Sequence, residues 1–112
     1  MKFTGDGVLC LMPSAGSAVA VTVEIRDALL EADMSIRCGV HVGDVDHRDD
    51  DVSGLAVNIA ARVMALAPDG RVVVTNAVRE AAAGANLRFD GFGTHRLKGV
   101  VGDWPLYLLA DD

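Results

Sequence analysis

Hydrophobic and polar residues change along the chain between strand-like and helix-like spacing. The first residues predict a hairpin, in which Phe3-Thr4 and a strand over 8–12 flank the turn Gly5-Asp6-Gly7. A helix is predicted to begin at Pro13-Ser14 with one buried stripe. The stripe contains Ala18, Val21, Ile25, Ala28, Leu29 and Ala32, and the polar residues that fall mainly off it are Glu24, Arg26, Asp27 and Glu31.

Residues 36–43 alternate as a strand does, with one face toward a core. The two faces are Ile36, Cys38, Val40 and Val42 on one side and Arg37, Gly39 and His41 on the other. An acidic loop is predicted over 47–51, and a second helix over 54–66. The predicted core stripe of that helix contains Leu55, Ile59, Val63 and Leu66.

The remaining residues predict three short strands and one short helix. A turn at 68–70 precedes a buried strand over 72–74, and Asn76 is expected to cap a helix that ends near Ala83. Two further strands are predicted over 87–92 and 104–109. This order predicts a single α/β domain over 1–112, an α+β sandwich of the ferredoxin-like kind. Its one sheet is mixed and mainly antiparallel, with helices packed on it.

The composition narrows the classes of function. Hydrophobic residues make up 51% and aromatic residues 4% of the 112 residues, so the core is expected to be aliphatic. The net charge of −6 argues against broad binding to nucleic acid or anionic membranes, although local cations can still bind a phosphate. No signal peptide and no apolar run of membrane-spanning length are visible, which predicts a cytoplasmic domain. Cys10 and Cys38 are compatible with a disulfide, but two thiols are favoured.

Two pairs of residues are candidates for chemistry. Lys2 and Asp6 flank a glycine-rich turn, where a carboxylate suits Mg²⁺ but also suits an ordinary surface hairpin. Asn58 and Arg62 lie four residues apart, so they share one face of the second predicted helix. An amide beside a guanidinium can hold a ribose oxygen and a phosphate. The alternative is a solvated polar face, which fits less well because the rest of this helix is almost wholly apolar.

Weaker candidates are single charged or titratable residues. Asp51 is able either to cap the second helix or to accept a hydrogen bond from an exocyclic amine. Arg37 and Lys98 lie near predicted strand ends, where charged residues are common. His41 and His95 have no third ligand at zinc spacing, so a structural or surface role is predicted for both.

Four blocks of the sequence together resemble the class III nucleotidyl cyclase catalytic domain. They cover residues 2–7, 36–43, 51–63 and 97–100, in the order and spacing of the signature blocks of adenylyl and guanylyl cyclases. The segment 93–100 resembles the compact bacterial adenylyl cyclase type most closely. The resemblance implies conversion of ATP to cyclic AMP and pyrophosphate in intracellular signalling, at the interface of a head-to-tail homodimer.

The resemblance also implies roles for the reaction itself. Asp6 corresponds to one of two aspartates that bind Mg²⁺ or Mn²⁺. Asn58 corresponds to the residue that orients the ribose, and Arg62 to the one that stabilises the transition state. Charge accumulates on the phosphoryl oxygens when the 3′ hydroxyl attacks the α-phosphate, so metal ions and an arginine are suitable stabilisers.

Four further residues correspond to substrate-binding positions. Lys2 and Asp51 correspond to the residues that read adenine, and Arg37 and Lys98 to those that hold the triphosphate. A lysine only donates and an ionised aspartate only accepts hydrogen bonds. That polarity matches the ring nitrogen and the amino group of adenine and opposes the carbonyl of guanine.

The resemblance also implies that the chain begins within the second strand of the family's domain. The first strand, with the first metal aspartate, and the first helices are then expected to be missing, so an N-terminally incomplete domain is predicted. Little or no cyclase activity is therefore expected of the 112 residues alone, and exposed sheet edges favour swapping between chains. The alternative function is an inactive truncated cyclase fold that acts as a dimerisation or nucleotide-binding module.

Overall fold

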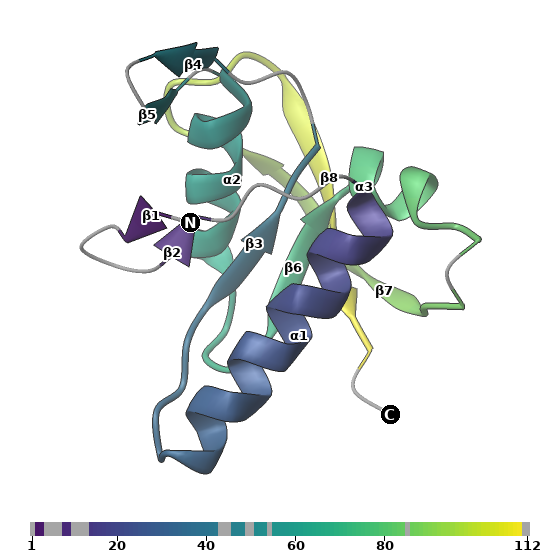
Figure 1. Ribbon diagram of the computed structural model, residues 1–112. Coiled ribbons are helices and arrows are strands. Elements are labelled where there is room, and N and C mark those ends of the chain that lie inside the picture. The colour runs from purple at the N-terminus through teal and green to yellow at the C-terminus, as the bar shows by residue number, and fades with distance from the viewer. Residues whose placement is uncertain are drawn as a thin grey trace.

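The centre of the molecule is a four-stranded sheet with the strand order β3-β6-β8-β7 (Figure 1). The computed structural model describes residues 2–3, 8–9, 14–42, 46–48, 51–53, 55–84 and 86–110, with only the main chain in 2–3, 8–9, 46–48 and 51–53. β3 and β6 are parallel, and β8 is antiparallel to both of its neighbours. These strands are Cys38–Val40, Val72–Thr75, Phe89–Arg96 (β7) and Asp103–Leu109 (β8). The predicted mixed, mainly antiparallel sheet is thus confirmed.

Helices cover both faces of this sheet. α1 (Ala15–Glu31) and α3 (Asn76–Ala81) lie on one face, and α2 (Leu55–Leu66) lies on the other. The strand β6 is buried throughout because it has a core on each side. Val72 and Val74 pack in the cluster under α1 and α3, while Val73 packs in the cluster under α2. Alternation along a strand therefore places apolar residues on both faces.

The helix α1 begins where the sequence predicted but faces the sheet with different residues. The hydroxyl of Ser14 caps it by accepting a hydrogen bond of 3.1 Å from the backbone N–H of Ser17. Ala15, Val19 and Arg26 are its buried residues. The predicted stripe was therefore wrong by about 100° around the helix axis. Because α1 is rich in alanine and valine on all sides, its hydrophobic pattern did not fix which side is buried.

The helix α2 matches its predicted bounds, and Ile59 and Val63 are buried as expected. Leu55 and Leu66 were also predicted to be buried, but they are 61% and 39% exposed. The buried side of α2 runs instead through Ile59, Val63 and Ala67. At 100° per residue, Leu55 and Leu66 lie on the side away from Ala67. They were predicted to be buried because they are apolar.

Two short hairpins lie outside the four-stranded sheet. β1 (Lys2–Phe3) pairs with β2 (Val8–Leu9), which confirms the predicted N-terminal hairpin; residues 4–7 and 10–13 lie outside the described residues. β4 (Asp46–Arg48) pairs with β5 (Asp51–Ser53) where an acidic loop was predicted, so that prediction was wrong.

The N-cap of the short helix α3 differs from the residue predicted for it. Asn76 was expected to be its cap, but Thr75 occupies the N-cap position and Asn76 is the first helical residue. The Asn76 side chain bonds along the helix instead, donating to Glu80 at 3.1 Å and accepting from Arg79 at 2.9 Å. Thr75 makes no side-chain capping bond, because its hydroxyl is engaged elsewhere.

The strand directions give the sheet two distinct ends. β3, β6 and β7 run in one direction, since β7 is antiparallel to β8 and β8 is antiparallel to β6. Their carboxyl ends therefore lie together, and the chain leaves the sheet at that end at His41 and again at Leu97. Arg37 precedes β3 and lies at the opposite end. Among the described helices, none is long and apolar enough to cross a membrane.

Candidate functional site

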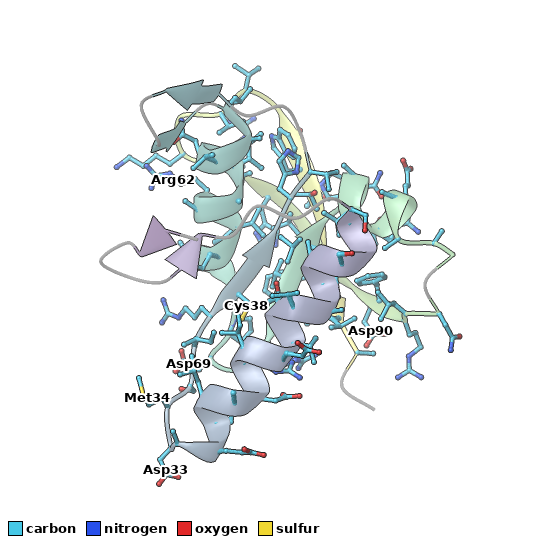
Figure 2. All side chains as sticks on the ribbon, in the orientation of Figure 1. Asp33, Met34, Cys38, Arg62, Asp69 and Asp90 are labelled. Atoms are coloured by element: carbon cyan, nitrogen blue, oxygen red, sulfur yellow. The ribbon has the colours of Figure 1, made fainter. Side chains whose placement is uncertain are left out.

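The outer face of α2 carries the polar pair that the sequence singled out. This face, away from the sheet, consists of Leu55, Asn58, Ala61, Arg62, Ala65 and Leu66, all exposed. These residues span about 140° of the helix circumference. Asn58 and Arg62 make no hydrogen bond or ion pair with any residue that the structure describes. Arg62 projects from α2 away from the sheet (Figure 2). Both side chains are thus free to bind a ligand or a partner.

A close contact between backbones fixes α2 on the sheet. A Cβ atom added to Gly39 of β3 would lie 2.4 Å from the backbone nitrogen of Met64 and 2.8 Å from the carbonyl oxygen of Ala60. Only glycine allows the strand and the helix to approach so closely. The direction in which Asn58 and Arg62 point therefore depends on Gly39.

Asp51 lies in β5, beside the start of α2. β5 contacts α2, and Asp51 pairs in register with Arg48 of β4. The helix begins at Leu55, so Asp51 does not occupy the N-cap position that sequence reasoning left open for it. Lys2 lies in β1. The side chains of Lys2 and Asp51, and all of Asp6, lie outside the described residues.

The turn after β7 presents Lys98 at the carboxyl end of the sheet. Leu97 is 3% exposed and anchors one side of the turn in the cluster under α2. The backbone N–H of Val100 donates to the carbonyl of Leu97 at 2.9 Å, which closes the turn. Gly99 has a φ angle of 80°, which favours glycine. Lys98 is exposed, on a turn whose backbone is held in place.

Arg37 lies at the other end of the sheet, where its Nε donates to a carboxylate oxygen of Asp69 at 3.2 Å. The two side chains are 56% and 71% exposed, so this ion pair is weak. β8 runs between the two ends and spans about 20 Å at about 3.3 Å per residue. Arg37 and Lys98 of one chain are therefore not brought together, whereas Lys98 and the start of α2 share one end.

His41 and His95, the two histidines whose side chains the structure describes, have structural contacts, as predicted. His95 Nε2 lies 2.7 Å from the carbonyl oxygen of Phe92, and its ring stacks on Phe92. His41 Nδ1 lies 2.8 Å from the hydroxyl of Thr75, and burial lowers the pKa of His41 below its ordinary value. Within the described part of the chain, no three His, Cys, Asp or Glu side chains gather to hold a metal ion. Cys38 is a free, buried thiol, as favoured from the sequence, and Cys10 lies outside the described residues.

Sequence reasoning missed two residues that contact a candidate site residue or the turn that carries one. Asp69 was interpreted only as part of the turn that ends the second helix, yet it is the partner of Arg37. Trp104 was interpreted only as a strand residue, yet it contacts both His41 and the turn that carries Lys98. A lone tryptophan in a chain with few aromatic residues was the available signal for Trp104.

Comparisons with known proteins agree on one family. Residues 9–111 match the adenylate and guanylate cyclase catalytic domain. A curated relative, putative adenylate cyclase 3 of Rhizobium meliloti (strain 1021), is 34% identical over an aligned length of 108 residues, and the match covers 88% of this chain. The chain spans only 18% of that relative's length, and 40% of another curated relative.

Solved structures share the fold. An adenylate/guanylate cyclase/hydrolase from Silicibacter pomeroyi matches with a TM-score of 0.84 at 28% identity, covering 99% of this chain and 71% of that one. The catalytic core of a rhodopsin-guanylyl cyclase with converted specificity, in complex with ATPαS, matches with a TM-score of 0.76. At 20% identity, with 89% of this chain and 60% of that one covered, it supports the fold alone.

Proposed function

The chain belongs to the adenylate and guanylate cyclase catalytic domain family, and on that premise we propose that it is an adenylyl cyclase domain. The proposed reaction converts ATP to cyclic AMP and pyrophosphate by attack of the ribose 3′ hydroxyl on the α-phosphate. The choice of ATP rests on the name of the Rhizobium relative and on the polarity of Lys2 and Asp51. A cytoplasmic location would supply both ATP and the signalling pathway that cyclic AMP serves.

The observation that carries this proposal is the outer face of α2. Asn58 and Arg62 are exposed there, one helical turn apart, and no described residue engages them. In the proposed reaction Asn58 orients the ribose, and Arg62 donates to the phosphoryl oxygens as charge accumulates on them. A guanidinium on a fixed helix needs no rearrangement at that moment, which is the condition for effective electrostatic catalysis.

The site is proposed to form between two chains. Arg37 and Lys98, both assigned to the triphosphate, lie at opposite ends of one sheet. A head-to-tail pair of chains would bring the Lys98 end of one chain to the Arg37 end of the other. The apolar residues Leu55, Ala61, Ala65 and Leu66 around the polar pair support this arrangement, since a partner would cover them.

Divalent metal ions are part of the proposal. Asp6 is the residue that would ligate Mg²⁺ or Mn²⁺, and the chemistry supplied there would be polarisation of the α-phosphate and activation of the 3′ hydroxyl. The residues of this chain bind and orient the nucleotide around that centre. Lys2 would donate to the ring nitrogen of adenine and Asp51 would accept from its amino group.

Cyclic AMP formation from ATP by the full-length gene product, with Mg²⁺ or Mn²⁺, tests the proposal. Arg62→Ala is expected to lower kcat by about 100- to 1,000-fold, as removal of one preorganised donor does. Arg88→Ala is the matched control, because it also removes an exposed arginine but lies at the start of β7 at the far edge of the sheet. It is expected to leave kcat within about twofold.

Two outcomes would contradict the proposal. Equal turnover of Arg62→Ala and the unchanged protein would remove Arg62 from the reaction. Absence of cyclic nucleotide formation in the unchanged full-length protein, with nucleotide still bound, would favour the alternative of an inactive dimerisation or nucleotide-binding module.

A further inference from the structure

A cluster of three side chains lies at the carboxyl end of the sheet, on the face that α2 covers. His41, directly after β3, is half-buried, and its Nδ1 lies 2.8 Å from the hydroxyl oxygen of Thr75 at the end of β6. The rings of His41 and Trp104 meet edge to face, with centroids 5.8 Å apart and an angle of 81° between their planes. The cluster thus joins β3, β6 and β8 where their connecting segments leave the sheet.

Trp104 connects this cluster to the turn that carries Lys98. Its indole N–H donates to the carbonyl of Val101 at 3.2 Å, although the Val101 side chain is 95% exposed. Leu97 anchors the other side of the same turn in the core. Lys98 therefore lies between a buried leucine and a tryptophan whose ring is held by His41.

We propose that His41 is a positioning residue for the Lys98 turn, acting through the ring of Trp104. Only the role of Lys98 in binding phosphate rests on the proposed function; the mechanical link from His41 to the turn does not. Thr75 fixes the orientation of the imidazole, because its hydroxyl bonds to His41 instead of capping α3. The imidazole in turn limits the positions open to the indole ring and hence to the carbonyl of Val101.

The link is expected to depend on pH because His41 can be protonated. Burial lowers the pKa of His41, so the neutral imidazole is the form that the folded cluster accommodates. When the pH falls through that lowered pKa, a charged ring must be hydrated, and its contact with Trp104 is expected to loosen. The Lys98 turn is therefore expected to be held tightly at neutral pH and more loosely in acid.

The other described charged groups around the cluster are engaged elsewhere or lie on outer surfaces. On β6 the neighbour is the uncharged Thr75. On β7, His95 is the cross-strand partner of Trp104, but its ring stacks on Phe92 and bonds to the carbonyl of that residue. Among the charged groups of the packed elements, Asp103 of β8 pairs with Arg96, and Arg79 of α3 bonds to Asn76. Arg62 of α2 and Lys98 of the turn are exposed. Among the described titratable side chains, His41 is thus the one whose ring contacts the indole ring of Trp104.

The fluorescence of Trp104 tests the link directly, because it is the only tryptophan in the 112 residues. Protonated imidazole quenches a neighbouring indole, so the emission of the chain is expected to fall in one step below pH 6.5, the ordinary pKa of histidine. His41→Phe keeps an aromatic ring beside Trp104 but cannot be protonated, and the step is expected to vanish. His95→Gln and His47→Gln are the controls, and both are expected to retain it.

Hydrogen exchange of residues 97–102 at neutral pH provides the second readout. His41→Ala is expected to speed exchange in this turn by about three- to tenfold, the range that one aromatic pair contributes, while His41→Phe stays near the unchanged chain. The proposal is overturned if the acid step persists in His41→Phe, if it vanishes in His95→Gln, or if His41→Ala exchanges at the original rate. None of these measurements involves nucleotide, so failure of the adenylyl cyclase proposal would leave them interpretable.

Discussion

The two long helices cover opposite faces of the same sheet, but their outer surfaces differ. The exposed residues of α1 include the acidic Glu24, Asp27 and Glu31, which suit contact with water. The outer face of α2 exposes mostly leucine and alanine, with Asn58 and Arg62 between them. The residues that both helices bury against the sheet are apolar, apart from Arg26 of α1.

We propose that this difference separates a structural helix layer, α1, from one that takes part in function, α2. The buried Arg26 of α1 donates to the carboxylate of its neighbour Asp27 at 3.0 Å, so its charge is paired within the same helix. Arg62 of α2 makes no such ion pair with any described residue. An apolar helix face with an unengaged arginine and amide fits an interface with a ligand between two chains. We therefore expect substitutions in and around α2 to change catalysis and substitutions on the outer side of α1 to leave it unchanged.

The largest expected effect is on the choice of base. In the full-length protein, the double variant Lys2→Glu, Asp51→Cys is expected to lower ATP turnover by about 1,000-fold and to shift preference toward GTP. The reason is that a site built on hydrogen bonds loses affinity strongly when its buried polar groups face the wrong partner. Initial rates with ATP and with GTP measure both changes.

A control from the other layer sharpens this test. Glu31→Cys replaces an exposed carboxylate at the end of α1 with a thiol and is expected to leave both rates unchanged. If the double variant also keeps its rate and its selectivity for ATP, Lys2 and Asp51 do not read the base.

The next largest effect concerns the contact that holds the α2 layer on the sheet. Gly39→Val places side-chain atoms against backbone atoms of Ala60 and Met64, which cannot move without shifting α2. A loss of about 3 kcal/mol in the free energy of unfolding is expected from such overpacking. The urea midpoint measures it. Gly91→Val is the control, because no atom lies within 4 Å of a Cβ there, and equal midpoints for both variants would show that the close approach is not needed.

A mixing experiment tests whether α2 and the Lys98 turn of one chain work with Arg37 of another. Arg37→Ala and Lys98→Ala are each expected to lower turnover by about 10- to 100-fold, as loss of one charge-assisted contact does. An equal mixture of the two is expected to recover roughly a quarter of the original rate. Half of the dimers then pair one variant with the other, and each of those has one intact site of its two.

Arg37→Ala mixed with the double variant Arg37→Ala, Lys98→Ala provides the control. No chain in that mixture carries Arg37, so its rate should stay at the level of the single variant. Recovery confined to the first mixture would support a shared site. No recovery in either mixture would mean that one chain supplies both residues or that only one of them binds phosphate.

Much of the fold could be predicted from the sequence because local patterns set it. The bounds of α2 follow from an apolar run that ends in a turn, and β6 follows from consecutive valines. The buried side of α1 could not be predicted, because alanine and valine occur on all its sides. The β4–β5 hairpin was missed because a run of aspartates is typical of a loop, whereas cross-strand pairing is not local.

The residues of the candidate site likewise divide into those that local patterns predict and those that depend on the fold. Asn58 and Arg62 were found because helical spacing alone places them on one face. The separation of Arg37 from Lys98 depends on which strands are parallel, and the sequence does not contain that directly. The cluster of His41, Thr75 and Trp104 beside the Lys98 turn joins three segments distant in sequence, so only the folded chain reveals it.

The smallest expected effect concerns the α1 layer and its buried thiol. Burial raises the pKa of Cys38 above its ordinary value of 9.0, and the charge of Arg26 opposes this rise with a lesser effect. The folded chain therefore keeps the thiol proton at a pH where the unfolded chain has lost it. Because the unfolded state then binds fewer protons, stability is fully present below pH 9 and falls as the pH rises toward the raised value.

Urea unfolding of the unchanged chain and of Cys38→Ala, between pH 7 and pH 10, isolates this contribution. Other groups also titrate in this range, but they affect both proteins equally and cancel in the difference. The difference in unfolding free energy is expected to be constant below pH 9 and to shift against the unchanged chain above it. Arg26→Gln should enlarge this shift, because it removes the opposing charge. A difference that stays constant to pH 10 would mean that the thiol is hydrated in the folded state, and the α1 layer would then not be the closed apolar face that distinguishes it from α2.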